Sequence, residues 1–284
     1  QPDLMGSVHR ARIEQLFANQ NRAQGRLADG TAISIRLPKN HRSAVAVGAF
    51  ALVTITAAPR HGKAWQAVLG ARLVTATLVV LPGQSTVTIS RRCNDAAAMR
   101  ELAAALRVPE GFGVIVRRQA KATDRAQLQA SLDELVTDWQ AMYARCDPAM
   151  PGMLFSGGNL RQRACRFVPN ASYHSCTIGD ARSNAIEAAL SAAMRPEVGL
   201  PSGGRLWCQR THALWSIDID GADADIQNHG FDGLFGEAAV EIARQICLRG
   251  MSGPIMIDVP RAGSANKKFR SQLQNGLDDD PQNP

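Results

Sequence analysis

Hydrophobic and polar residues alternate over residues 6–72 of this chain, in the pattern of short β-strands rather than of helices. Turn signals such as Ala28-Asp29-Gly30 separate the alternating segments. The predicted strands are Val8–Ile13, Ala23–Leu27, Ala32–Leu37, Gly48–Thr56 and Ala64–Leu69. Five short strands over this length are typical of a small OB-fold barrel. We therefore predict an OB-fold-like domain at residues 6–72.

OB-fold barrels bind single-stranded nucleic acid on a basic face, usually with exposed aromatic rings that stack on bases. Aromatic residues are few in this segment. Phe50 lies in an apolar run and is expected in the core. Phe17 and Trp65 stay open between a core position and a stacking surface.

Strand and helix patterns mix in the middle of the chain. The predicted elements are a strand pair, Leu73–Leu81 and Ser85–Ser90, turned at Pro82-Gly83-Gln84, then a helix at Asp95–Leu106, a strand at Gly113–Val116, a helix from Asp124 to about Arg145, a strand–turn–strand passage at Gly152–Val168, and a helix at 181–194. In the longest helix apolar residues recur at helical spacing, which favours packing against a core.

The last part of the chain follows the order strand, strand, helix, strand. The strands are predicted at Arg205–Gln209, Ala213–Asp220 and Pro254–Val259, and the helix at Gly236–Arg249. The tail from Gly263 is polar, and its end at Asp278-Asp279-Asp280, with two prolines, is expected to be frayed or truncated. Together with the preceding segments this order predicts an α/β fold of the mixed α+β kind.

Charge divides unevenly along the chain. Residues 1–125 hold 18 Lys and Arg against 7 Asp and Glu, whereas residues 126–284 hold 14 against 18. A basic amino-terminal part suits a polyanion such as nucleic acid. A basic surface that only keeps the protein in solution is the alternative.

Composition narrows the protein class further. The apolar runs are far shorter than the roughly 20 residues that cross a bilayer, so no membrane segment is expected. Six scattered cysteines without a Cys-x-x-Cys pair disfavour a structural zinc site and favour reduced thiols in a cytoplasmic protein. The absence of Gly-x-Ser-x-Gly and P-loop motifs gives little support to serine nucleophiles or nucleotide hydrolysis.

Two aspartates, Asp218 and Asp258, each close an apolar run that is expected to form a strand. Asp220 shares one strand face with Asp218, because the two are two residues apart. If the strands are neighbours, three carboxylates converge, and a hard cation relieves their repulsion. Mg²⁺, with Mn²⁺ as the alternative, suits an all-oxygen site and activates water against a phosphodiester. Aspartates that only cap turns are the competing interpretation. Three acids just downstream are expected in a solvated loop: Asp223, Asp225 and Asp232.

Two arginine pairs, Arg91-Arg92 and Arg117-Arg118, each follow a predicted strand. With the turn at Gly83 they would form a pocket for a terminal phosphate, because the guanidinium fork binds phosphate oxygens in pairs. General surface charge is the alternative.

Several short segments occur in a fixed order over roughly residues 70–260. They are Gly70-Ala71-Arg72-Leu73, Leu81-Pro82-Gly83, Ile89-Ser90-Arg91-Arg92, Val108-Pro109-Glu110-Gly111-Phe112-Gly113-Val114-Ile115-Val116-Arg117, Leu200-Pro201-Ser202-Gly203-Gly204, Thr211-His212-Ala213-Leu214, Ile217-Asp218-Ile219, Glu237-Ala238-Ala239, Glu241-Ile242-Ala243-Arg244-Gln245-Ile246, Leu248-Arg249 and Ile257-Asp258. Each segment alone is a weak signal, but the ordered set resembles the ribonuclease E/G family of bacterial endoribonucleases.

The resemblance implies an RNase H-like core with an inserted OB-fold barrel and a DNase I-like segment that carries the metal. The corresponding domains are 6–72 for the barrel, 73–195 for the RNase H-like and 5′-sensor region, and 196–284 for the DNase I-like segment, inside which the chain is expected to stop.

The same resemblance places functional residues. It implies Mg²⁺ on Asp218 and Asp258, and a 5′-monophosphate pocket that maps to Gly83, Val87, Arg117 and Arg118. The sequence also departs from the family pattern. Asp220 stands where Asn is usual, Arg118 where Thr is usual, and Arg261 where a second acid usually follows the metal-binding strand. A different metal preference and a more basic phosphate pocket are the expected consequences.

These observations predict a Mg²⁺-dependent endoribonuclease that cleaves single-stranded RNA internally, in RNA processing or decay. Asp218 and Asp258 would ligate the metal, and Asp220 would be a third ligand or would orient water. A non-catalytic RNA-binding protein on a degenerate nuclease scaffold is one alternative, and a DNA-directed nuclease is another. Homo-oligomer formation, the natural RNA and its base preference are left open by the sequence.

Overall fold

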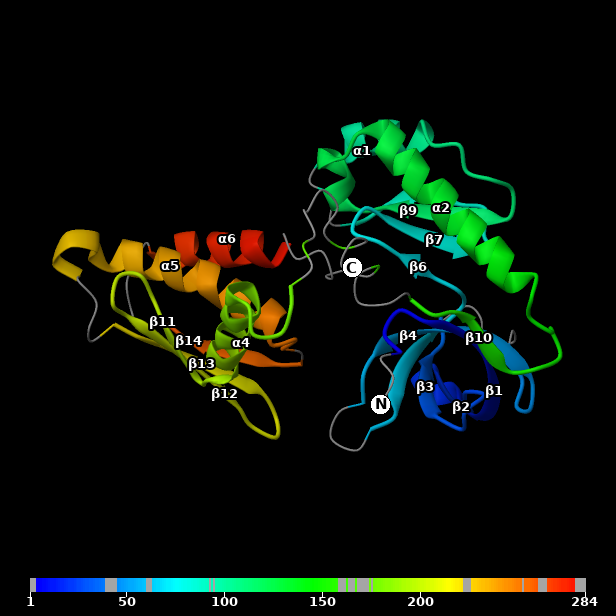
Figure 1. Ribbon diagram of the computed structural model, residues 1–284, viewed down its shortest axis with the longest axis horizontal. Helices are drawn as coiled ribbons and strands as arrows, with labels where there is room; N and C mark the ends of the chain where they lie inside the picture. Colours follow the sequence, from blue (N-terminus) through cyan, green and yellow to red (C-terminus); the bar gives the residue numbers. More distant parts are fainter. Residues whose placement is uncertain are drawn as a thin grey trace. The chain divides into compact units, whose positions relative to one another are not determined.

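The computed structural model describes residues 4–38, 45–59, 63–91, 93, 95–157, 162, 167, 174, 176–221, 226–251, 253–259 and 265–278. The chain divides into two compact units, residues 1–171 and 172–283. In Figure 1 the first unit combines a barrel with a helix-covered sheet, and the second unit is a single sheet with helices.

Five strands close into a barrel in the first unit. They are β1 (Val8–Phe17), β2 (Arg22–Arg26), β3 (Ala32–Arg36), β4 (Phe50–Ala57) and β5 (Trp65–Leu69). Their order is β1-β2-β3-β5-β4, and β4 pairs with β1 again to complete the circle. Alternate residues such as Ile13, Ile33 and Ile35 point inward and form the core. At Gly25 an added Cβ would lie 2.7 Å from the Arg12 carbonyl oxygen, so glycine permits the close approach of β2 to β1. The predicted OB-like barrel is confirmed.

The three barrel aromatics differ in exposure, and one of them departs from the expectation. Trp65 is a core residue, 8% exposed, whereas Phe50 is 39% exposed. The prediction that Phe50 lies in the core is wrong, because Phe50 opens β4 before the buried stretch of that strand begins. Phe17 is half-buried at the end of β1.

A second sheet in the same unit has the order β6-β7-β9-β8. Its strands are β6 (Leu73–Val74), β7 (Leu78–Pro82), β8 (Val87–Ile89) and β9 (Phe112–Val116). The prediction that Leu73–Leu81 pairs with Ser85–Ser90 is wrong. β9 lies between β7 and β8, antiparallel to β7 and parallel to β8. The nearly continuous apolar sequence of β9 explains its central position, since a central strand is buried on both faces.

Two helices cover this sheet, α1 (Ala96–Ala104) and α2 (Arg125–Tyr143), and two short 3₁₀ turns, η1 (Ala18–Gln20) and η3 (Arg118–Ala122), complete the unit. The predicted apolar stripe of α2 is buried, as Leu128 and Leu132 show. β10 (Gly152–Phe155) pairs with the amino-terminal half of β1. Most of the predicted passage beyond it, up to Val168, lies outside the described residues.

The second unit holds a four-stranded sheet in the order β11-β12-β13-β14. The strands are β11 (Glu197–Gly199), β12 (Arg205–Arg210), β13 (Trp215–Asp220) and β14 (Ile255–Asp258), and the helices are α4 (Ala181–Met194), α5 (Ile226–Leu248) and α6 (Ala265–Asp278). α5 connects the parallel strands β13 and β14 and packs Phe235 and Ile242 onto Ile217 of the sheet. The mixed α/β fold is confirmed.

No helix was predicted in the polar tail, but Ala265–Asp278 form α6. The segment expected to be frayed lies outside the described residues from position 279 on. Helix α6 is polar except for a narrow apolar stripe. Phe269 belongs to that stripe and is buried, and its ring centroid lies 6.5 Å from that of Phe235 in α5. At Gly276 an added Cβ would lie 2.7 Å from the Cβ of Ala243, so the two helices touch closely there. None of the described helices is long and apolar enough to cross a membrane.

Candidate functional site

Asp218 and Asp258 stand directly opposite each other on two neighbouring strands. β13 and β14 run parallel and pair residue by residue, from Trp215 with Ile255 to Asp218 with Asp258. Register partners on neighbouring strands point to the same face of the sheet, and the strands are ~4.8 Å apart. The condition on which the predicted metal site depends, that these strands are neighbours, is met.

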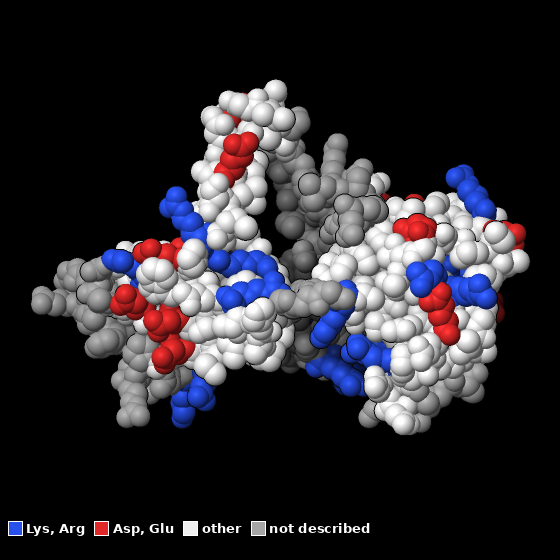
Figure 2. Space-filling model, turned by 90° about the horizontal axis from the view of Figure 1, so that it is seen from below, with Lys and Arg blue, Asp and Glu red and all other residues white. Residues whose placement is uncertain are grey.

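Both aspartates lie on what we call the outer face, the side of this sheet away from α5. Ile217 and Ile257 precede them in sequence and point to the core, whereas Asp218 and Asp258 are exposed. The carboxylates thus stand at the carboxyl ends of two parallel strands, where open α/β sheets bind ligands. In Figure 2, acidic side chains gather on this unit with basic side chains beside them.

Asp220 lies on the outer face too, but one step further along β13 than Asp218 and Asp258. It is half-buried at the end of β13, past the last residue of β14, and its register partner is Arg205 on β12. Within the part of the chain that the structure describes, no three His, Cys, Asp or Glu side chains are grouped so that they could hold a metal ion. Asp223 and Asp225 lie outside that part. Asp232 falls in α5 rather than in the expected loop, and its side chain is likewise not described.

The geometry of the pair fits a hard cation. Two ionised carboxylates at neighbouring strand spacing repel each other, and a divalent cation relieves this repulsion. Mg²⁺ is commonly held by one or two protein carboxylates, with water and substrate phosphate in its other positions. Asp218 and Asp258 supply oxygen ligands only, which suits Mg²⁺ or Mn²⁺ better than softer metals.

A tight turn before β12 ties this sheet to α5. The Ser202 amide donates to Glu237 Oε2 at 2.9 Å, and the Leu200 amide donates to the Gly204 carbonyl at 2.7 Å. A Cβ at Gly204 would lie 2.5 Å from Leu234 Cδ1, so any larger residue at this position would displace the Leu234 side chain of the helix. The turn thereby fixes the start of β12, on which the register of β13 depends.

The structure brings some residues of the predicted phosphate pocket to one end of the sheet, but not all of them. β8 and β9 are parallel, so Arg91 after β8 and Arg118 after β9 stand at the same end of their sheet. Burial raises the pKa of Cys93, and the positive charge of Arg118 acts in the opposite direction. Arg118 is therefore near the loop that contains Arg91 and Cys93. Arg92 lies outside the described residues.

Gly83 is at the other end of the same sheet. Its amide donates to the Gly111 carbonyl at 2.8 Å, just before β9 begins, whereas Arg117 directly follows the end of β9. Five strand residues, about 17 Å, separate these two ends. Val87 is 41% exposed and opens β8 opposite Val114, between the two ends. The structure therefore does not bring Gly83 to the arginines.

Arg117 and Arg118 have different environments. The buried guanidinium of Arg117 donates to the Thr75 carbonyl, and its amide donates to the Thr77 carbonyl at 2.8 Å. Arg118 opens η3 and is half-buried. Access for a phosphate is thus better at Arg118 than at Arg117.

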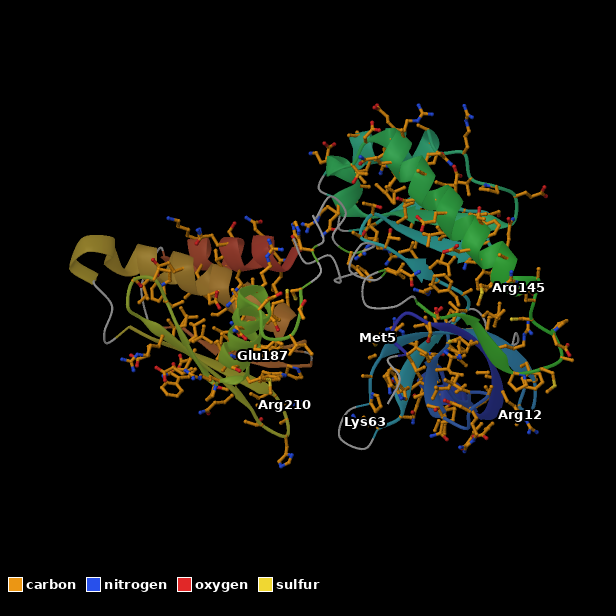
Figure 3. All side chains as sticks on the ribbon, viewed as in Figure 1. Met5, Arg12, Lys63, Arg145, Glu187 and Arg210 are labelled. Carbon is orange, nitrogen blue, oxygen red and sulfur yellow. The ribbon has the colours of Figure 1, made fainter. Side chains whose placement is uncertain are left out.

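The barrel carries a basic surface whose residues were not named from the sequence. We call it the basic barrel face, and it consists of four exposed arginines on β1, β2 and β3: Arg12, Arg22, Arg26 and Arg36. A hydrogen bond from Arg26 at 2.8 Å lowers the pKa of Glu14. Figure 3 labels Arg12 on this barrel. Arginine at alternating positions of predicted strands was the signal that could have identified this face.

Trp207 is also absent from the predicted site residues. In β12 it alternates with the buried Leu206 and Cys208, which places it on the outer face, and its register partner is Asp218. The same alternation is visible in the sequence, but the pairing of β12 with β13 is not.

Comparison with known proteins gives one family. A model of the ribonuclease E/G family matches residues 73–184 and 180–283. The chain is similar to Ribonuclease E of Escherichia coli strain K12, with 32% identity over 222 residues, which cover 64% of this chain and 21% of that protein. Ribonuclease E of Haemophilus influenzae is 26% identical over 259 residues, which cover 77% of this chain and 28% of that protein.

A third relative gives the same result. Ribonuclease E of Nostoc sp. is 25% identical over 221 residues, which cover 64% of this chain and 32% of that protein. The chain therefore spans about a fifth to a third of the length of these relatives.

Proposed function

The chain belongs to the ribonuclease E/G family, and from this premise we propose that it is a metal-dependent endoribonuclease that cleaves single-stranded RNA internally, in RNA processing or decay. The observation that carries the proposal is the register pairing of Asp218 with Asp258 on the outer face. Two carboxylates held together by the backbone of parallel strands are suited to an oxygen-coordinated cation at the ligand-binding edge of the sheet.

In this proposal Asp218 and Asp258 would hold Mg²⁺, with Mn²⁺ as the alternative, and Asp220 would orient the attacking water or add an oxygen ligand. A cation bound there supplies a water of lowered pKa and neutralises charge that develops on the phosphate. The basic barrel face binds phosphates along the RNA strand without reading its sequence. Arg118 and Arg91 would bind a 5′-terminal phosphate, and Arg117, which donates to the Thr75 carbonyl, would stabilise the chain beside Arg118.

The finer fold assignment belongs to the same proposal. Residues 73–195 would form the RNase H-like and 5′-sensor region, and residues 196–284 the DNase I-like segment that carries the metal. The support for the second assignment is the mixed sheet with its acidic pair, packed on α5.

The decisive variants are Asp218→Asn and Asp258→Asn. Each removes one charge from the pair and leaves the strand intact, so we expect the rate of Mg²⁺-dependent cleavage of a labelled single-stranded RNA to fall about 100-fold or more. Binding of the same RNA in chelator, measured by fluorescence anisotropy, should stay unchanged. Glu187→Gln, at an exposed carboxylate on α4, is the control and should cleave as the parent does. Cleavage at the parent rate in either Asp variant would rule out the mechanism.

A non-catalytic RNA-binding protein is the second candidate. It is favoured by the result that no group of three metal-binding side chains occurs among the described residues. The same assay separates the two, because this candidate binds RNA but gives no product that depends on Mg²⁺ and disappears with chelator.

A further inference from the structure

Four strands of the second unit present one side chain each in a single row across the outer face: Glu197, Trp207, Asp218 and Asp258. We propose that Trp207 is a stacking platform for one nucleobase of single-stranded RNA, immediately beside the phosphate that is cleaved. This inference rests on the proposed function, because it takes the phosphate at Asp218 and Asp258 as its reference point.

The row places an aromatic ring and the acidic pair within the reach of one nucleotide. Trp207 and Asp218 are register partners on antiparallel strands, and Asp218 and Asp258 are register partners on parallel strands. With neighbouring strands ~4.8 Å apart, Trp207 is one strand from Asp218 and about 10 Å from Asp258. A nucleotide whose phosphate lies at the pair can therefore place an adjacent base over the indole.

The environment of Trp207 distinguishes it from the other three tryptophans. Trp65 and Trp139 are buried in the first unit, and Trp139 stacks on Tyr143 with 5.4 Å between ring centroids. Trp215 lies under the guanidinium of Arg210, at 5.6 Å from its ring centroid. Trp207 is half-buried, lies outside the core cluster of its unit, and makes no ring contact with a described residue.

The charges around the ring favour a base over a phosphate. Glu197 and Asp218 flank Trp207 on the two neighbouring strands, so a phosphate above the indole would be repelled, whereas a neutral base would not. Arg205 stands two residues before Trp207 on the same face, with Nη1 at 3.4 Å from Glu197 Oε1. It offers a cationic contact for a phosphate next to the stacked base.

Stacking on one ring gives selectivity for single strands rather than for a base sequence. Every base has a flat π-face, so any base can occupy the platform. A base in a duplex is paired and stacked between its neighbours, and it must be unstacked before it can reach the indole. The row would thus restrict the site to unpaired RNA.

The test uses the whole chain with Trp207→Ala and Trp207→Phe. In chelator, we expect Trp207→Ala to weaken binding of a labelled single-stranded oligonucleotide about 5- to 150-fold, and Trp207→Phe to retain most of the affinity. Val240→Ala, at an exposed apolar residue of α5 on the helix side of the sheet, is the control and should bind as the parent does. RNA should quench tryptophan fluorescence in the parent and quench it less in Trp207→Phe, although Phe still binds.

Parent-like affinity of a folded Trp207→Ala would overturn the inference, as would equal losses for single-stranded and duplex RNA or full quenching in Trp207→Phe. Because binding is measured without metal, these outcomes do not depend on hydrolysis. Failure of the proposed function would instead appear as absence of metal-dependent cleavage in the parent.

Discussion

Arg117 and Arg118 are neighbours in sequence but perform different tasks in the fold. Arg117 is buried and donates to the Thr75 carbonyl at the turn between β6 and β7, so it stabilises the chain around it. Arg118 begins η3 on the more accessible side and is near Cys93. A substitution at each position therefore reports on a different property.

The proposed 5′-phosphate contact predicts that the parent cleaves 5′-monophosphate RNA about tenfold faster than its 5′-hydroxyl twin. We expect Arg118→Gln to remove this difference, because a charge-assisted contact is lost. Arg117→Met should instead lower the free energy of unfolding by about 1–3 kcal/mol, since the buried Thr75 carbonyl loses its donor. Arg107→Gln, at an exposed arginine of the same unit, is the control. Equal rates on the two RNAs in the parent would leave these arginines as general backbone contacts.

At the scale of elements, the contact of α5 with α6 depends on small residues. A Cβ at Gly276 would lie 2.7 Å from the Cβ of Ala243, below any real contact distance, whereas a Cβ at Gly236 would meet Gln272 Oε1 at 3.4 Å. Both glycines are inside helices, where alanine is intrinsically favoured by about 1 kcal/mol. Their substitutions should therefore have opposite signs.

We expect Gly276→Ala to lower the free energy of unfolding of the second unit by about 1–3 kcal/mol, because the added methyl forces the helices apart. Gly236→Ala should be neutral or stabilising, since its methyl makes an ordinary contact. Urea denaturation followed by circular dichroism measures both. A stabilised Gly276→Ala would show that the helices do not pack as closely as described.

Helices and strands with a strong local hydrophobic pattern were predictable from the sequence. Features that depend on packing or pairing with distant segments were not. The alternating strands of the barrel and the apolar stripe of α2 follow from periodicity alone. α6 was not predicted because its sequence is mostly polar. Its narrow apolar stripe is explained by the contact of Phe269 with Phe235 of α5, which the sequence does not show. The position of β9 between β7 and β8 was missed because strand order depends on long-range pairing.

The candidate site shows the same division. The ends of two apolar runs identified Asp218 and Asp258, and the fold places them in register. Gly83 does not converge with Arg117. Gly83 follows β7, which is antiparallel to β9, so it lies where β9 begins, whereas Arg117 follows the end of β9. Trp207 could not be found from sequence, since its relation to Asp218 exists only across a pair of strands.

At the scale of the whole molecule, charge follows the division into units. Residues 1–171 hold 22 Lys and Arg against 11 Asp and Glu, and residues 172–283 hold 10 against 14. Binding of the RNA backbone is thus expected from the first unit and chemistry from the second. Binding and cleavage should then be separable by substitution.

We expect RNA binding to weaken with salt, and the double variant Arg12→Gln/Arg36→Gln to reduce the slope of log K against log salt by about 1.4, because each phosphate contact on a single strand contributes about 0.7. Arg270→Gln, on α6 of the second unit, is the control and should leave the slope unchanged. Anisotropy titrations in chelator over a series of salt concentrations measure the slope. An unchanged slope in the double variant would place the RNA elsewhere than on the basic barrel face.

Asp218 and Asp258 are 40 positions apart in the sequence, and the hydrogen-bond ladder of β13 and β14 brings them into register. Side chains along a strand alternate with a period of two, so one codon gained or lost in β14 ahead of Asp258 would swing its carboxylate under α5 and bring an apolar neighbour to the surface. The arginines of the barrel would be untouched by such an event. Under the proposed function, an in-frame insertion of three bases at this point would thus abolish cleavage and leave RNA binding intact, with every acidic residue still present.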